Sequence, residues 1–288
     1  MARRHGGTAV RAVKRPSHRK DGRMRDSSWR LAAPSFVLPA GVEENGRFLA
    51  GRVDEVALCF FETRACLDYT RADLPPSLAA LPGRGGAPLR WHVHLPLDLP
   101  WPGAHDAAAC RRTARLALRV LQRAEHLAPR CAVLHPPEGD TAARRRMLTD
   151  FIDEWRRHSS VPLLLENTRT CDVLSLGEDF LSAQGAAFCL DVGHAMGYAQ
   201  TALLRSPLPA HAVMVHWSAP LAGDAHAALT AWTPEQRHTA ARLAAILPRS
   251  ATHVLELFSW QRLKASLPLL EHLLNGVSTA SRFAAPAT

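Results

Sequence analysis

The stretch FCLDVGH, at residues 188–194, joins a short apolar run to two residues that can bind a metal ion. Asp191 closes the run, and His194 follows three residues later. Five more apolar runs end in the same manner: WHVHLP at His94, AVLHPP at His135, PLLLENT at Glu166, VMVHW at His216 and VLELF at Glu256. Asp, Glu and His make up only 41 of the 288 residues (26 Asp and Glu, 15 His), so chance does not account for six such endings.

Eight short runs rich in Val, Leu and Phe predict β-strands. They cover residues 35–40, 54–61, 90–96, 131–135, 161–166, 186–191, 212–217 and 253–258. Segments with helical spacing lie between most of them, most clearly at 105–128, 141–158, 171–183, 233–247 and 261–274. Thr233 and Gln236 form a capping box around Pro234, and Asp140 or Thr141 can cap the helix at 141–158.

This repeated alternation of strand and helix predicts an α/β fold, the (β/α)8 TIM barrel. An open doubly wound sheet would need a glycine-rich phosphate loop after an early strand, whereas the Gly83-Arg84-Gly85-Gly86 stretch precedes a strand. TIM barrels build their active sites at the C-terminal ends of the strands. A barrel therefore also brings the six closing residues together.

Side chains two residues apart share one face of a strand. The pairs related in this way are His92 and His94, Cys189 and Asp191, Met214 and His216, and Val254 and Glu256. We expect His92, the deeper residue of its pair, to have a structural role. Gly193 permits the tight turn that brings His194 back over the barrel mouth. The loop GDAHA places Asp224 two residues before His226, so that both can bind one ion.

The formal net charge of +9 is concentrated at the N-terminus. Residues 1–30 contain ten Lys or Arg and two Asp, a net charge of +8, which leaves +1 for the other 258 residues. We expect a disordered basic tail at 1–33, a single barrel domain at 34–278 and a flexible C-terminus at 279–288.

No apolar run approaches the roughly 18 residues that a membrane span needs. The Arg3-Arg4 pair is not followed by the apolar region of an export signal. The six cysteines form no CxxC pair, and Cys59, Cys131 and Cys189 fall in predicted strands, where a thiol is usually a small core residue. We expect a cytoplasmic protein without membrane contact.

Histidine and carboxylate side chains that converge at a barrel mouth are ligands for divalent metal ions. At these residues the chain resembles the xylose-isomerase-like TIM barrels, and more narrowly the AP endonuclease family 2 branch with the endonuclease IV-type apurinic endonucleases. That family holds three divalent ions at the barrel mouth. The resemblance covers residues 35–275 and implies three ligand sets: His94, His135 and Glu166; Glu166, Asp191, His216 and Glu256; and His194, Asp224 and His226.

The chemistry implied by this resemblance is phosphoester hydrolysis by a hydroxide held between two metal ions, with the third ion neutralising a phosphate oxygen or the leaving alkoxide. Glu166, Asp191, His216 and Glu256 would be catalytic, and Glu256 would act as a plain ligand or orient the attacking water. Zinc is the expected metal, and manganese or iron suit the same ligands.

The phrases FVLPAGV, HVHLPLDLPW, LDVGHAMGYAQ, HWSAP, GDAHAAL and LELFSW are most similar to the cobamide-remodelling phosphodiesterases, which open the nucleotide loop of adenosylcobamides. This similarity implies a small-molecule cobamide substrate and a role in cobamide salvage. The tryptophans in or beside the predicted mouth loops could form an apolar platform for a flat ligand or its nucleotide base: Trp101, Trp217, Trp232 and Trp260. Glu62 fits either the wall of the same pocket or a helix cap.

A sugar isomerase or epimerase of the same fold is the main alternative. It would hold one metal with Glu166, Asp191, His216 and Glu256, and both glutamates would move protons. His135, His194, Asp224 and His226 would then be superfluous as ligands.

An apurinic endonuclease acting on DNA is a second alternative, although a duplex-binding protein needs a broad cationic face that the near-neutral barrel does not provide. A third is a non-enzymatic protein that binds nucleic acid through the basic tail.

Overall fold

The computed structural model describes residues 29–177, 179–221 and 226–280. Eight parallel strands form a closed barrel in the order β1-β10-β7-β6-β5-β4-β3-β2. The strands are β1 (Arg30–Pro34), β2 (Glu55–Cys59), β3 (Arg90–His94), β4 (Ala132–Leu134), β5 (Leu163–Glu166), β6 (Ala187–Asp191), β7 (Ala212–Trp217) and β10 (Thr252–Leu255). The chain is a (β/α)8 TIM barrel, as the sequence predicted.

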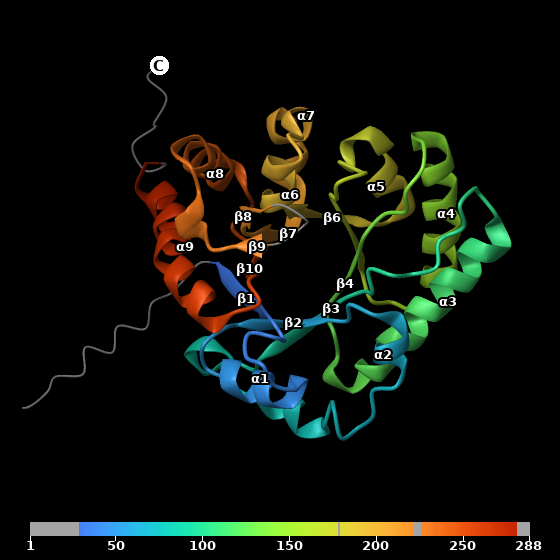
Figure 1. Cartoon of the computed structure of the whole chain (residues 1–288), viewed down its shortest axis with the longest axis horizontal. Coiled ribbons are helices and arrows are strands. Elements are labelled where there is room, and N and C mark those ends of the chain that lie inside the picture. The colour runs from blue at the N-terminus through green and yellow to red at the C-terminus, as the bar shows by residue number, and fades with distance from the viewer. Residues whose placement is uncertain (1–28, 178, 222–225, 281–288) are drawn as a thin grey trace, which may run out of the picture.

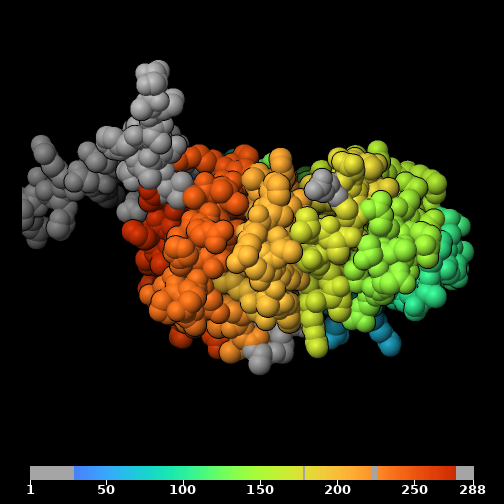
Figure 2. All heavy atoms as spheres, turned by 90° about the horizontal axis from the view of Figure 1, so that it is seen from above, coloured from blue at the N-terminus to red at the C-terminus, as the bar shows by residue number. Residues whose placement is uncertain are grey.

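Helices surround the barrel on the outside (Figure 1). They are α1 (Val42–Leu49), α2 (Thr63–Leu67), α3 (Ala107–Arg123), α4 (Thr141–His158), α5 (Phe180–Gln184), α6 (Val192–Gly197), α7 (Thr201–Arg205), α8 (Pro234–Ile246) and α9 (Trp260–Ala280). Short 3-10 helices occur at Pro76–Ala80, Arg84–Gly86, Glu125–Leu127, Leu174–Leu176, Leu208–His211 and Leu229–Ala231, and β8 (Ala219–Pro220) pairs with β9 (His226–Ala227). Figure 2 shows that segments adjacent in the sequence also lie next to each other in space, from the green segments to the red ones.

Two of the long helices begin with the caps that the sequence predicted. The Thr233 hydroxyl accepts a hydrogen bond from the Gln236 amide, and the Gln236 side chain accepts one from the Thr233 amide. The Asp140 carboxylate accepts a hydrogen bond from the Ala143 amide at the start of α4. Both caps satisfy backbone N–H groups that have no partner within the helix.

Two predicted elements differ from the structure. The first strand is not at 35–40 but at Arg30–Pro34, so residues 30–33 belong to the barrel rather than to the basic tail. Its RLAAP sequence is a weak strand signal, but the small Ala32 fits the crowded barrel interior, where it packs among buried side chains. The predicted helix at 171–183 is wrong as well. Gly177, at φ 96°, ends the short helix Leu174–Leu176 in a conformation that favours glycine, and α5 begins only at Phe180.

The barrel interior shows the predicted alternation of side chains. A small apolar cluster fills its centre: Ala32, Cys131, Val133, Leu164, Cys189, Met214 and Val254. Cys189, Met214 and Val254 of this cluster lie two positions before Asp191, His216 and Glu256. The side chains of Asp191, His216 and Glu256 therefore project from the same inner face of the barrel. His92 also lies inside, with its Nδ1 2.7 Å from Glu55 Oε1, and this buried pair fits the structural role expected for it.

All six cysteines are buried and unbridged. Within the described part of the chain, no helix combines the length and the apolar character needed to cross a membrane.

Candidate metal centre

The strand ends meet at the floor of a cleft of about 910 Å³. His94, Glu166 and Asp191 are the last residues of β3, β5 and β6, whereas His135 and Glu256 follow β4 and β10 directly. The structure brings together eight of the nine predicted metal ligands: His94, His135, Glu166, Asp191, His194, His216, His226 and Glu256. The ninth, Asp224, lies outside the described residues.

Glu166 lies at the centre of this cluster and divides its two carboxylate oxygens between different histidines. Oε2 lies 3.2 Å from His94 Nε2 and 3.5 Å from His135 Nε2. Oε1 lies 3.4 Å from His216 Nδ1 and 3.7 Å from His194 Nδ1. A carboxylate with partners on both oxygens has the geometry needed to bridge two cations.

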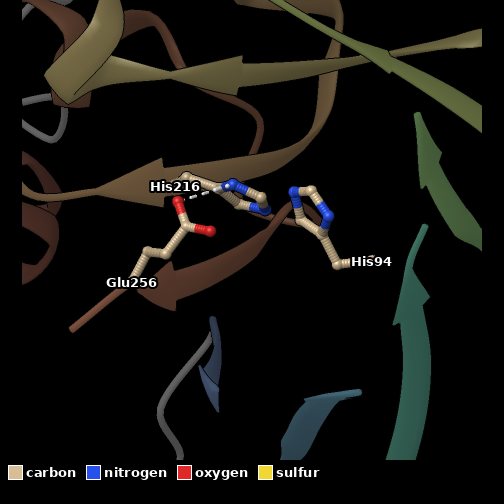
Figure 3. A group of neighbouring side chains, drawn as sticks. All are labelled: His94, His216 and Glu256. Carbon is tan, nitrogen blue, oxygen red and sulfur yellow. Dashed lines mark ion pairs between the residues drawn. The ribbon is translucent and has the colours of Figure 1, made fainter. Parts of the chain in front are cut away.

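Glu256 adds a second carboxylate at His216 Nδ1, the atom that also faces Glu166. Its Oε2 lies 3.1 Å from His216 Nδ1 and 3.9 Å from His226 Nε2. Figure 3 shows Glu256, His216 and His94 converging from β10, β7 and β3 on one point.

The potential ligand atoms fall into overlapping groups in which all atoms lie within 4.8 Å of one another. Three of these groups follow the predicted ligand sets closely: His94, His135 and Glu166; Glu166, Asp191, His216 and Glu256; and Asp191, His194 and His226. A further group adds Cys189 to Glu166 and His216, which the sequence pattern had not suggested. Burial raises the pKa of the Cys189 thiol to about 12, so this side chain is a neutral thiol at the base of the centre.

Three histidines are oriented by hydrogen bonds at Nδ1. His94 Nδ1–H donates to the Leu95 carbonyl at 3.1 Å, and His194 Nδ1–H donates to the Asn167 carbonyl at 3.0 Å. His226 Nδ1 lies 2.9 Å from the Ser218 hydroxyl. A partner at Nδ1 fixes the ring and leaves Nε2 for a metal ion, the usual arrangement around bound metals.

Asn167 and Asp191 connect the ends of β5 and β6. The Asn167 side chain accepts a hydrogen bond from the Asp191 amide at 2.7 Å and donates one to the Asp191 carbonyl at 2.9 Å. It also donates to the Gln200 side chain at 3.0 Å. The sequence analysis missed Asn167, although its place directly after Glu166 was a usable signal.

Histidine side chains supply the positive charge that compensates the buried carboxylates of the centre. Within the described residues, the ion pairs of Glu166, Asp191 and Glu256 all involve imidazole rings. Burial would raise the pKa of Glu166, but His216 and His135 hold it well below its usual value. An ionised carboxylate in a buried site needs such compensation, and a divalent cation provides it directly.

Asp191 and His194 form a coupled pair next to this centre. Burial raises the pKa of the Asp191 carboxyl to about 6, against the lowering effect of His194. Burial lowers the pKa of His194, but the Asp191 and Glu166 carboxylates outweigh it and raise the value to about 9. The pair therefore carries opposite charges near neutral pH.

Four buried atoms of the cluster have no hydrogen-bond partner among the described residues: Asp191 Oδ2, the two ring nitrogens of His216, and Glu256 Oε2. Asp191 uses Oδ1 to accept from the His194 amide at 2.5 Å, which leaves Oδ2 without a partner. His216 Nε2 is likewise without one. Buried polar atoms are rarely left in this state, and carboxylate oxygens and imidazole nitrogens are good ligands for a divalent cation. The donor set therefore fits bound metal.

The tryptophans do not form the predicted platform. Trp101 lines the cleft, but Trp217 and Trp232 are buried in the outer core and meet edge to face, with ring centroids 6.1 Å apart at 64°. Trp217 follows the inward-facing His216, so the strand alternation turns it towards the helices. Trp260 packs on Phe48 instead. Glu62 is an exposed residue before α2 and does not line the cleft.

Gly193 is required for space rather than for its backbone conformation. A Cβ atom at this position would lie 2.1 Å from the Ser218 hydroxyl oxygen and 3.2 Å from Asp191 Oδ1. The predicted tight turn is in fact the first turn of α6, with Asp191 as its cap. The glycine therefore allows α6 to pack directly against the hydroxyl that orients His226.

The substitution Gly193→Ala is expected to destabilise the protein by about 2–3 kcal/mol, because the overpacked methyl group must displace buried neighbours. The double variant Gly193→Ala/Ser218→Ala removes the closest contact and should recover at least half of this loss. Urea unfolding of the two variants and of Ser218→Ala alone measures the coupling. Equal stability of the single and double Gly193 variants would contradict this explanation.

Comparison with known proteins gives information on the fold. No protein-family model matches the sequence, and the search of curated proteins found no match. Among solved structures, a D-tagatose 3-epimerase-like protein is 16% identical with a TM-score of 0.64, over 88% of this chain and 99% of that one. Endonuclease IV from Thermus thermophilus is 17% identical with a TM-score of 0.60, over 86% and 99%.

The TTHB071 protein, also from Thermus thermophilus and soaked with ZnCl2, is 22% identical with a TM-score of 0.57, over 86% of this chain and 98% of that one. At these identities the similarity establishes a shared fold. That fold is the TIM barrel, which this chain shares with the D-tagatose 3-epimerase-like protein and with endonuclease IV.

Proposed function

We propose that this protein is a metal-dependent phosphodiesterase. The division of the Glu166 oxygens between two pairs of histidines carries this proposal, because it prepares the carboxylate to bridge two cations. The proposed ligands are the predicted nine, including Asp224, and they would hold up to three ions. Zinc is the expected metal, with manganese or iron as substitutes.

Divalent ions bound here would supply a hydroxide near neutral pH and stabilise negative charge on the phosphate oxygens. The protein's own contribution is orientation. The Glu166 oxygens are held in place by the neighbouring histidines, and Asp191 Oδ1 is held by the His194 amide in α6. Glu256, between His216 and His226, is placed to accept a hydrogen bond from the attacking water and so to direct it. His216 Nδ1 faces both Glu166 and Glu256, so this one imidazole offsets the negative charge of both carboxylates.

We further propose that the substrate is the nucleotide-loop phosphodiester of an adenosylcobamide. The sequence phrases at the strand ends support this assignment. The cleft supports a small-molecule substrate, because its described lining contains one arginine, Arg169, against three glutamates, Glu138, Glu166 and Glu256. A protein that grips duplex DNA, as the endonuclease alternative requires, needs many more cationic contacts.

A sugar isomerase or epimerase is the second candidate function. It is favoured by one observation: Glu166, Asp191, His216 and Glu256 alone form a compact buried group that could hold a single ion. The surrounding histidines argue for the phosphodiesterase. His94 and His135 face the other oxygen of Glu166 and would have no metal to bind in a one-metal enzyme.

Metal analysis and one reaction distinguish these functions. Purified protein should contain two to three divalent ions per chain and should convert adenosylcobalamin to a product lacking the nucleoside, detected by mass spectrometry. One ion per chain, with no phosphoester cleavage and with interconversion of ketoses, would establish the isomerase instead. Cleavage of abasic DNA but not of adenosylcobalamin would establish the endonuclease.

A further inference from the structure

Phe61, Leu97 and Phe258 form an apolar wall of the cleft. These residues follow β2, β3 and β10, which lie on one side of the barrel. Leu97 is 51% exposed and Phe258 is 39% exposed. Exposing large apolar side chains to water costs free energy. Such exposure beside a cluster of ionisable groups commonly marks a binding surface.

The loops after β4 and β5 add polar side chains to the opposite side of the cleft. Thr168, Arg169 and Thr170 follow β5, and Glu138 follows β4. The candidate metal ligands lie between the two walls at the floor of the cleft. A ligand that occupies this cleft therefore meets hydrogen-bonding groups on one side and hydrocarbon on the other.

The apolar wall is built from mutually supporting rings. Phe61 and Phe258 have centroids 5.3 Å apart at 72°, an edge-to-face contact, and Phe36 lies 6.1 Å behind Phe61. The Leu97 amide donates a hydrogen bond to the Phe61 carbonyl at 3.2 Å, which joins the two loops. Since the ring contacts hold the Phe61 and Phe258 side chains in place, these two rings lose little conformational entropy when a ligand binds.

Phe258 also contacts the metal centre itself. Its ring centroid lies 5.9 Å from that of His226, a proposed ligand. A flat group on this wall is thus directly beside the point where the phosphate would be held. The described residues of the wall carry no charge, so an aromatic ring suits it better than a sugar or a second phosphate.

We propose that the wall of Phe61, Leu97 and Phe258 binds the aromatic heterocycle of a nucleotide whose phosphate lies at the metal centre. This inference rests on the proposed function and deepens it, since it makes the base, rather than the phosphate alone, a determinant of substrate choice. Phe258 is the main specificity residue, because its ring contacts both Phe61 of the wall and the proposed ligand His226.

The test compares two ligands that differ only in the base, adenosine 5′-monophosphate and ribose 5-phosphate. Isothermal titration is performed on the full-length protein as purified, with its metal content measured on the same sample. We expect the wild-type protein to bind the nucleotide about tenfold more tightly, as aromatic stacking of a base provides. Phe258→Ala should lose this preference without a change in affinity for ribose 5-phosphate.

Two further variants serve as controls. Phe258→Leu keeps an apolar side chain and should retain part of the preference, whereas a purely structural role for Phe258 would change both affinities together. Ile246→Ala removes an apolar side chain of similar exposure from the end of α8 and should change neither.

Equal binding of the two ligands by wild-type protein would overturn this inference, and so would a preference that survives in Phe258→Ala. A metal-loaded protein that prefers the nucleotide but cleaves no phosphodiester would instead contradict the proposed function and leave the wall assignment standing.

Discussion

Replacing Glu166 with glutamine is expected to lower the rate of phosphodiester hydrolysis by more than about 100-fold and to remove at least one metal ion per chain. Even outer partners of metal ligands change affinity or activity by about 10–100-fold, and a bridging ligand serves two ions at once. The amide of glutamine keeps the size of the side chain, but it loses the negative charge and one acceptor oxygen. Elemental analysis and the rate of adenosylcobalamin cleavage measure the two effects.

Glu55→Gln is the matched control for this experiment. Glu55 is also a buried glutamate inside the barrel with a histidine partner, His92 at 2.7 Å, but it belongs to none of the candidate ligand groups. This variant should lose stability and yet keep its metal content and an activity within about threefold of wild type. If Glu166→Gln behaved like Glu55→Gln, Glu166 would be a structural residue and the bridging role would be wrong.

Removal of the metal ions is expected to lower the thermal midpoint by about 10 °C for each tightly held ion. A ligand present at 1,000 times its Kd stabilises the folded state by about 4 kcal/mol, and each kcal/mol shifts the midpoint of a chain of this size by about 2–4 °C. The effect is large because Glu166, Asp191 and Glu256 are buried close together and depend on cationic partners.

Calorimetry of protein dialysed against a chelator, before and after metal is restored, measures this shift. Glu166→Gln should show a smaller difference between its two states, since it has fewer ions to lose. Midpoints that agree within about 2 °C for chelated and restored wild-type protein would show that the cluster is stabilised by its internal ion pairs alone.

The positions of the strands could be predicted from the sequence because the interior strands are short runs of apolar residues with turn signals at both ends. The exception is instructive. In β1, RLAAP contains two alanines and a charged residue, so the neighbouring FVLP sequence was the stronger local signal. Only the closed barrel, in which β1 pairs with both β10 and β2, shows that RLAAP is the strand.

The candidate ligands could be predicted for a different reason. Alternation along a strand decides which side chains share a face, and barrel closure gathers the strand ends. Both are consequences of local sequence, so Asp191, His216 and Glu256 could be placed together without coordinates. The same alternation would have turned Trp217 away from the cleft, had it been applied to the residue after His216.

The contacts around the centre could not be predicted in this way. Ser218 orients His226, and Gly193 makes room for that hydroxyl, but these residues belong to separate loops whose approach depends on how α6 packs. The apolar wall of Phe61, Leu97 and Phe258 likewise joins loops from three strands. The periodicity of a single segment does not predict such contacts between loops.

The sequence by itself determined the (β/α)8 class and the chemical nature of the centre, since both depend on the period of the apolar runs and on the residues that end them. The tertiary structure alone decided how the centre is arranged: which histidines face each oxygen of Glu166, which aromatic side chains reach the cleft, and why position 193 has no side chain. These features depend on the packing of loops that are distant in the chain, and that packing exists only once the barrel has closed.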